Sequence, residues 1–158
     1  MSNPYQSPEA DLAAGLPQQE YVGFWIRVGA SVVDSIIMLM IIAPLLYYIY
    51  GMEYFLGDHI IAGPADFLLN YIFPAIAVIV FWIYKSSTPG KMAFKAIIVD
   101  AQTGLKPSSK QLIGRYFAYY VSLIPIGLGF FWIIWDSRKQ GWHDKLAGTV
   151  VVYRPISV

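Results

Sequence analysis

Two ionisable residues interrupt the first apolar stretch of the chain and are its clearest candidates for chemistry. Arg27 and Asp34 are seven residues apart, so a helix would place both side chains on one face, about 10 Å apart along its axis. An arginine can extend to the membrane surface, but a deep carboxylate must pair, face water or bind a proton. The pair predicts either an ion-pair lock or a proton or ion route through Asp34.

A second pair of ionisable residues brackets the last long apolar stretch. Arg115 precedes this stretch and Asp136 follows it. If the stretch folds back on itself, both residues lie at one membrane surface. Asp136 would then pair with either Arg27 or Arg115, and the sequence leaves that choice of partner open.

Two short polar segments carry further candidate residues. Ser86–Lys91 lacks the spacing of a nucleotide-binding loop, so we predict a turn near lipid headgroups with Lys91 drawn to anionic phosphates. Trp142, His143 and Asp144 lie together after the last apolar stretch. They indicate a polar cap at the membrane interface with Trp142 as its anchor, and the alternative is an acid–base pair of His143 and Asp144.

Three long runs without charge must position these residues. Each is 18 to 20 residues long, the length that a spanning helix needs, and they are Ser35–Met52, Phe67–Tyr84 and Tyr116–Trp135. With 57% hydrophobic and 13% charged residues, the composition fits a small integral membrane protein better than an apolar soluble helical domain. We predict an all-α membrane protein in which the first two runs are full transmembrane helices.

The third run is predicted to be a broken or re-entrant segment. Pro125 and Gly127 lie near its centre, where proline removes a helix donor and glycine adds conformational freedom. Half-helices over about 112–124 and 128–136 are each too short to cross a hydrocarbon core of about 30 Å. A re-entrant hairpin fits these lengths if the first two helices cover its turn. A single third span is the alternative.

Two β-branched segments lie on either side of the third run in the sequence. They are Ala96–Asp100 and Thr149–Arg154, and turn-forming residues adjoin each one. Two isolated strands are natural pairing partners, which requires both to lie on one side of the membrane. We therefore predict a small two-stranded cytoplasmic β element and a cytoplasmic C-terminus.

The basic residues predict the orientation in the membrane. Ten of the 11 Lys and Arg residues follow position 84, and the loop Gly51–Asp66 contains none. Because basic loops stay in the cytoplasm, the first helix is predicted to run outward from a cytoplasmic N-terminus. We predict a flexible polar tail over residues 1–20, a membrane domain over 21–154 and a C-terminal tail over 155–158.

Several classes of protein are excluded by what the sequence lacks. The chain contains no cysteine, so it has no disulfide framework and no cysteine-ligated metal. Its basic residues are scattered between apolar runs, which argues against a nucleic-acid partner. The sequence carries no catalytic motif, and its two histidines are far apart. We expect no enzyme, no cofactor and no metal site.

Several blocks of residues resemble the RDD family of small bacterial membrane proteins. These blocks are Phe24–Ala30 with Asp34, Thr88–Lys91, Ile97–Asp100, and Gln140–Val151 together with Asp136 and Arg138. The resemblance covers about residues 21–154, the predicted membrane domain. The family is named after one arginine and two aspartates. Arg27 and Asp34 match the pair in the first helix, and the second aspartate is Asp136 or Asp144.

The resemblance implies a location in the bacterial inner membrane and leaves two functions open. One is transport, such as exchange of monovalent cations for protons. So small a chain cannot enclose a pathway alone, so transport requires a homo-oligomer. The alternative is a membrane adaptor or scaffold that binds partner membrane proteins, with the Arg/Asp set as a structural lock. In both cases the lipid bilayer surrounds the chain.

Overall fold

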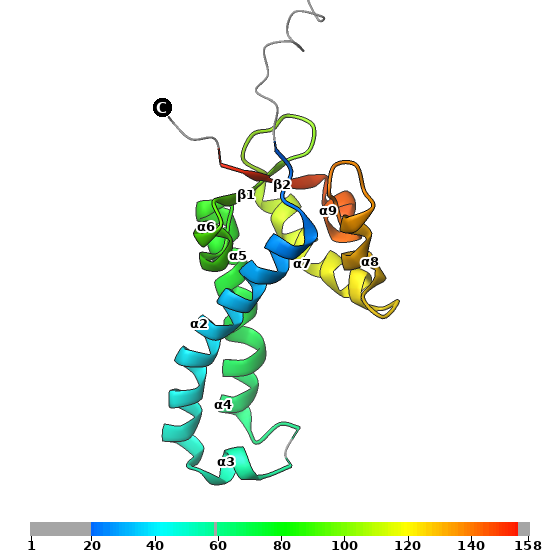
Figure 1. The fold of residues 1–158 in the computed structure, drawn as a ribbon. Helices are drawn as coiled ribbons and strands as arrows, with labels where there is room; N and C mark the ends of the chain where they lie inside the picture. The colour runs from blue at the N-terminus through cyan, green and yellow to red at the C-terminus, as the bar shows by residue number, and fades with distance from the viewer. Residues whose placement is uncertain (1–19, 59, 155–158) are drawn as a thin grey trace, which may run out of the picture.

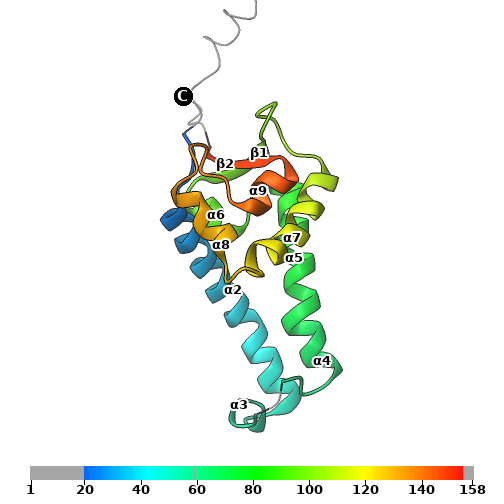
Figure 2. The ribbon, with the colours of Figure 1, turned by 90° about the vertical axis from the view of Figure 1, so that its right-hand side faces the viewer.

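The structure, a computed structural model, describes residues 20–58 and 60–154 (Figure 1). Two long helices lie side by side and end in a head of short helices and strands, which comprises residues 86–154 (Figures 1 and 2). The predicted tails lie outside the described residues, except for Glu20. The elements before the head are α2 (Phe24–Tyr50), α3 (Glu53–Leu56), α4 (Pro64–Phe67), the π-helical η1 (Leu68–Ile72) and α5 (Phe73–Lys85).

Within the described residues, the head contains four short helices or helical turns, one longer helix and two strands. In chain order its elements are α6 (Pro89–Ala93), β1 (Ala96–Asp100), α7 (Ser109–Leu123), α8 (Leu128–Phe131), the 3₁₀ turn η2 (Trp132–Ile134), α9 (Trp142–Ala147) and β2 (Thr149–Tyr153).

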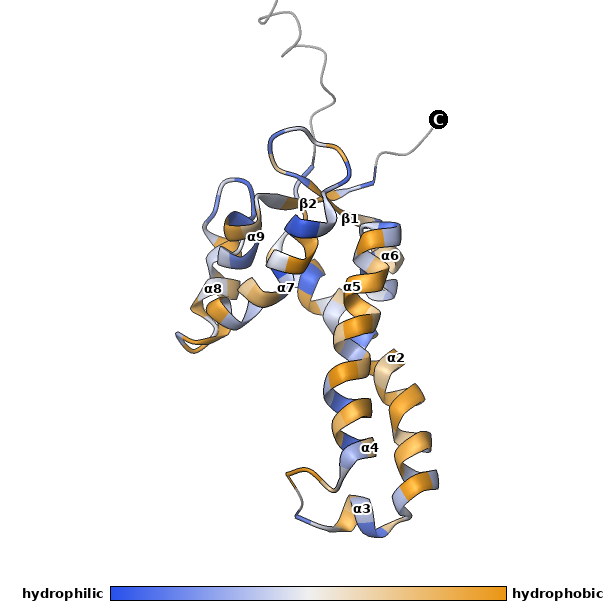
Figure 3. Ribbon diagram, turned by 180° about the vertical axis from the view of Figure 1, so that it is seen from behind, coloured by the Kyte–Doolittle hydropathy of each residue, from blue (hydrophilic) through white to orange (hydrophobic). Residues whose placement is uncertain are grey.

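Two helical segments are long and apolar enough to cross a membrane. They are α2 and the segment Pro64–Lys85, which joins α4, η1 and α5. Apolar residues occupy most of their length (Figure 3), and little of either segment is buried within the chain. A helix that is apolar on all sides is typical of a membrane span. The sequence predicted these two helices, whereas their orientation across a bilayer stays a prediction.

The third apolar run is broken, as predicted from its proline and glycine. The axes of α7 and the helical segment Leu128–Ile134 are inclined by 111°. Between them Ile126 and Gly127 have φ values of 54° and 76°, and this left-handed backbone cannot continue a right-handed helix. The second half is irregular and ends two residues earlier than the expected 136. Both halves belong to the head (Figure 2), which fits a re-entrant hairpin.

The two predicted strands pair with each other. β1 and β2 are antiparallel, with Ala96 opposite Tyr153 and Asp100 opposite Thr149. β2 ends one residue before the predicted Arg154. Tyr21, just before α2, forms a bridge to Val152. The sheet therefore ties three distant parts of the sequence to one end of the molecule.

The main apolar core lies under this sheet. One buried cluster combines side chains from the segment just before α2, the end of α5, both strands and α7. It contains Val22, Trp82, Ala96, Ile98, Leu112 and Val151. Burying such side chains contributes about 1.5–3 kcal/mol each. The head thus shares one core with Val22 and the end of α5, and the long helices extend from it with most of their apolar surface uncovered.

Candidate functional site

A buried carboxylate forms the centre of the candidate site. Arg27 Nη1 donates to Asp144 Oδ2 at 2.6 Å, and Arg115 Nη1 forms an ion pair with Oδ1 of the same carboxylate. The backbone N–H of Gly141 donates to Oδ2 at 2.9 Å. The side chain of Asp144 is fully buried. One aspartate therefore holds arginines from two different helices.

Short helix α9 positions this carboxylate. Asp144 is the third residue of α9, and it accepts a hydrogen bond from Gly141, the residue before the helix. An acidic residue in the first helical turn also interacts favourably with the helix dipole. Helix α9 packs mainly on α7, so Asp144 is directed at the helix that carries Arg115.

Each arginine makes further hydrogen bonds to the head. Arg27 Nε donates to the Val22 carbonyl at 3.0 Å, and Nη2 donates to the Lys139 carbonyl at 2.5 Å. Arg115 Nη1 donates to Thr149 Oγ1 at 2.6 Å. The network thus joins α2, α7, α9 and β2, which lie far apart in the sequence.

The arginines keep Asp144 ionised. Burial alone would raise the pKa of Asp144, but Arg115 and Arg27 outweigh burial and hold its pKa well below the usual range. Removing one partner of a buried ion pair typically costs about 3–5 kcal/mol, because an uncompensated charge remains. The network can therefore act as a lock for the fold.

Asp34 contacts a different part of the head from its predicted neighbour Arg27. Its Oδ2 accepts from Thr88 Oγ1 at 2.5 Å, and its Oδ1 accepts from the Gly90 N–H at 2.6 Å. Thr88 is also the N-cap of α6 and accepts from the Lys91 N–H. Asp34 therefore fixes the start of α6 against α2. Helix α2 is not interrupted at Asp34.

The expected partner of Asp136 is wrong. Asp136 forms an ion pair with Lys145, whose side chain is 45% exposed, instead of with Arg27 or Arg115. It also accepts from the backbone N–H groups of Arg138 at 3.1 Å and Gln140 at 3.0 Å. These hydrogen bonds hold the turn before α9. The buried partner of Arg27 and Arg115 is Asp144.

His143 does not form the polar cap predicted at the membrane interface, because its side chain is buried in the head. His143 is 2% exposed, and its ring packs between Tyr119 and Phe130 at centroid distances of 4.3 and 5.0 Å. Its backbone N–H donates to Ser122 Oγ at 3.0 Å, and its Nδ1 lies 3.2 Å from the same hydroxyl. Trp142 is half-buried near Trp132.

The structure places Lys91 in a short helix, where the sequence predicted a turn near lipid headgroups. It lies in α6, is 7% exposed, and its Nζ is 5.2 Å from the centroid of the Trp82 ring. Burial lowers the pKa of Lys91, because an ammonium group loses hydration when it leaves water.

Acidification is expected to destabilise the fold through His143. Burial lowers the pKa of His143 to about 3, although nearby Asp144 acts in the opposite direction. Between pH 6.5 and that value, the unfolded chain binds a proton that the folded chain rejects, so stability falls as pH falls. We expect a loss of about 2 kcal/mol between pH 7 and pH 4.5.

Detergent unfolding curves at both pH values measure this loss. The variant His143→Gln should flatten the dependence over this range, since its side chain does not titrate. An unchanged slope in that variant would assign the pH dependence to other groups.

Several residues that complete the site were missed in the sequence. Thr149, Ser122 and Gln140 were not singled out, yet Gln140 Nε2 donates to the Thr149 carbonyl at 2.7 Å. Gln140 and Thr149 lie in the Gln140–Val151 block that carries the family resemblance, which was the available signal, whereas Ser122 is an isolated hydroxyl in an apolar run and gave none. Thr88 before Pro89 is a recognisable N-cap signature and could have indicated the start of α6.

A further polar cluster, also missed, lies at the opposite end of the long helices. Asp66 is 2% exposed and accepts from Tyr54 Oη at 2.7 Å and from the Ala62 N–H at 2.8 Å. Asn70, one turn later, also donates to it. These contacts close the connection between the two long helices.

Comparisons with known proteins agree on one family. A sequence model described as the RDD family matches residues 21–148. The uncharacterized protein RP437 of Rickettsia prowazekii is 43% identical over 86 residues, which are 54% of this chain and 47% of that protein. The uncharacterized protein YxaI of Bacillus subtilis is 31% identical over 150 residues, 84% of this chain and 97% of that protein. The chain thus matches about half of the first relative and nearly all of the second. No solved structure matches the chain.

Proposed function

The chain belongs to the RDD family, and from this premise we propose that it is a membrane scaffold for partner membrane proteins. In this proposal the long helices span the bilayer, and the head is a platform fixed to them by the Arg27–Asp144–Arg115 network. The family and the two membrane-type helices make the chain a membrane-type protein. Neither the family nor the helices indicate a scaffold role, which the contacts within the chain must support.

The observation that carries the proposal is the commitment of the deep polar groups to contacts within the chain. Asp34, the sole acid in α2, has both oxygens engaged by α6 and its cap. Protonating it would remove the charge that strengthens those hydrogen bonds. Such a carboxylate suits a fixed joint better than a proton carrier.

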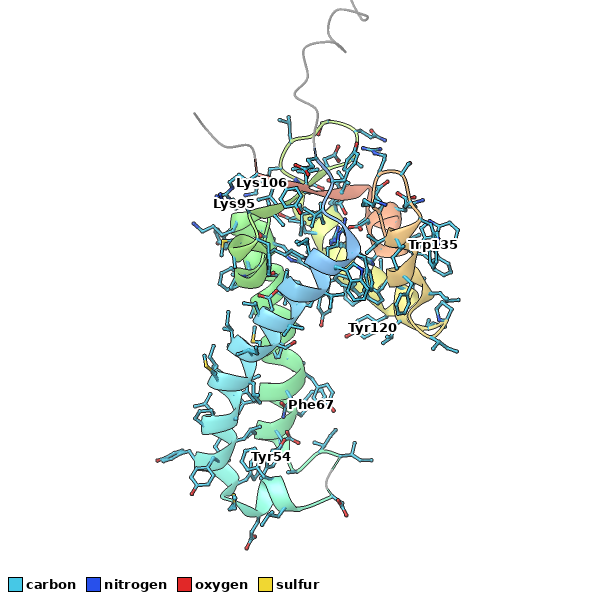
Figure 4. All side chains as sticks on the ribbon, viewed as in Figure 1. Tyr54, Phe67, Lys95, Lys106, Tyr120 and Trp135 are labelled. Carbon is cyan, nitrogen blue, oxygen red and sulfur yellow. The ribbon has the colours of Figure 1, made fainter. Side chains whose placement is uncertain are left out.

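The charge distribution supports a cytoplasmic location for the head. Lys95 and Lys106 lie around the sheet, whereas Tyr54 lies at the opposite end of the long helices (Figure 4). Because basic residues favour the cytoplasmic face, we place the head and both termini there. The membrane would be the bacterial inner membrane, with α7 and α8 as a hairpin re-entering from the cytoplasmic side.

In this proposal a partner membrane protein binds the uncovered surfaces of the long helices. Ile76 and Val80 of α5 are 57% and 43% exposed. A photo-crosslinking residue at each position should give, in cells, a protein adduct of one defined mass. The same residue at exposed Leu105 of the head loop is the control for random collision. Lipid adducts alone at both α5 positions would contradict the scaffold.

A second candidate function is cation/proton exchange by a homo-oligomer. The observation in its favour is that Asp34 lines a cavity of about 390 Å³ between α2 and α5. In proteoliposomes, wild-type protein should then move protons in response to a Na⁺ or K⁺ gradient, and Asp34→Asn should abolish this while Asp136→Asn retains it. Absence of proton movement by the wild type would remove this candidate and leave the scaffold standing.

A further inference from the structure

Two cavities meet between the long helices and the head. The first has a volume of about 510 Å³ and lies between α2 and the α7–α8 hairpin. The second, of about 390 Å³, lies between α2 and α5. Both are lined by the same set of polar or amphipathic side chains, which are Ser31, Ser35, Lys91 and Tyr119. The junction of the two cavities is therefore polar.

Apolar side chains line the cavities away from this junction. Successive turns of α2 supply one wall of the first cavity, with Val28, Val32, Ile36 and Leu39. The second cavity is lined by residues of α2 and α5 that include Ile37, Met38, Val78 and Phe81. Both walls thus run along α2 away from the head, toward the part of the helix expected in hydrocarbon.

Lys91 is a buried basic residue at the junction, and it has no anionic partner among residues 20–58 and 60–154. Its residue is 93% buried, and no carboxylate of the described residues lies within 4.0 Å of its Nζ. Its Nζ lies over the face of the Trp82 ring, and this interaction compensates a desolvated ammonium group only in part. Because Lys91 lines both cavities, a ligand there would meet this charge directly.

With Lys91 protonated, the described charged residues around the cavities carry one more positive than negative charge. Arg27, Lys91 and Arg115 line them as cations, and the carboxylates nearby are Asp34 and Asp144. Both carboxylates already have partners. One monoanionic group at the junction would balance the set, and basic pockets between membrane helices are known to hold lipid headgroups.

We propose that the joined cavities bind one anionic phospholipid, with its phosphate on Lys91 and one acyl chain in each cavity. The two apolar walls match the two chains, and free phosphate would leave both walls uncovered. A zwitterionic lipid brings its own cation to a site that already carries excess positive charge. This site goes beyond the scaffold role and does not depend on it.

Native mass spectrometry of the purified, delipidated chain in detergent tests the proposal. We expect one phosphatidylglycerol to be retained per chain, with an affinity at least about tenfold above that of phosphatidylcholine. Inorganic phosphate at the same concentration should not displace it. Equal retention of both lipids, or displacement by phosphate, would overturn the proposal, and the latter would indicate a site for a free anion.

Two variants address the two halves of the ligand separately. Lys91→Met removes the charge with little change in volume and should weaken phosphatidylglycerol binding about tenfold, while exposed Lys85→Met, the matched loss of charge, should not. Val32→Trp fills the first cavity and should also weaken binding, while Met40→Trp, elsewhere on α2, should not.

Melting temperatures establish that each variant is folded. If Lys91→Met does not fold, phosphatidylglycerol binding by Val32→Trp alone tests the proposal. Wild-type affinity for phosphatidylglycerol in a folded Lys91→Met or Val32→Trp variant would overturn the proposal.

Discussion

Asp144→Asn is expected to lower the free energy of unfolding by about 3–5 kcal/mol, because it leaves two buried arginines without their shared counterion. The change keeps the size of the side chain, so packing is not the cause of the loss. Whole domains are stable by only about 5–15 kcal/mol. The variant should therefore accumulate poorly in membranes and melt far below the wild type when its tryptophan fluorescence is followed in detergent.

Asp136→Asn is the matched control for this prediction. Its partner Lys145 is partly exposed, and such pairs contribute about 0–1 kcal/mol. Both changes neutralise one aspartate close to α9. Equal melting temperatures for the two variants would show that the buried network does not lock the fold.

Gly90→Ala is expected to cost about 3 kcal/mol or more, although it adds a single methyl group. A Cβ at Gly90 would lie 2.0 Å from the carbonyl oxygen of Ala30 and 2.9 Å from Cγ of Asp34. The first of these atoms belongs to the backbone of α2, which cannot move without separating α6 from the helix. The same change displaces the carboxylate that holds α6.

Gly114→Ala gives the opposite expectation. Nothing lies within 4 Å of a Cβ at Gly114, which is inside α7. Alanine in a helix interior is favoured over glycine by about 0.5–1 kcal/mol, so this variant should melt above the wild type. Chemical unfolding of both variants in mixed micelles measures the difference, and a stable Gly90→Ala variant would refute the close contact of α2 with α6.

The elements of this fold could be predicted from the sequence because each has a local cause. The uncharged runs gave the long helices, Pro125 and Gly127 gave the break after α7, and the β-branched run Ala96–Asp100 coincides with β1. The pairing of the strands followed from their isolation. These features depend on neighbours in sequence, which patterns record.

The charged residues of the site could be predicted from the sequence, but their pairing could not. Arg27, Arg115 and Asp144 were all candidates, but 117 residues separate Arg27 from its partner, and no periodicity extends over that distance. Asp136 and Asp144 are the same residue type, and the sequence did not distinguish their roles. Only the packing of α9 on α7 buries one and leaves the other beside a partly exposed lysine. The sequence left Asp34 either in an ion-pair lock with Arg27 or on a proton or ion route, and it gave no sign of the hydrogen-bond donors at the start of α6.

The lock depends most directly on the coupling between Arg27 and Asp144. A double-mutant cycle with Arg27→Ala, Asp144→Ala and the double variant, followed by unfolding in mixed micelles, measures it. We expect a coupling energy of at least about 1.5 kcal/mol, and a value near zero for the parallel cycle of Arg27 with Asp34. A coupling near zero for Arg27 and Asp144, or an equal coupling for Arg27 and Asp34, would contradict the lock.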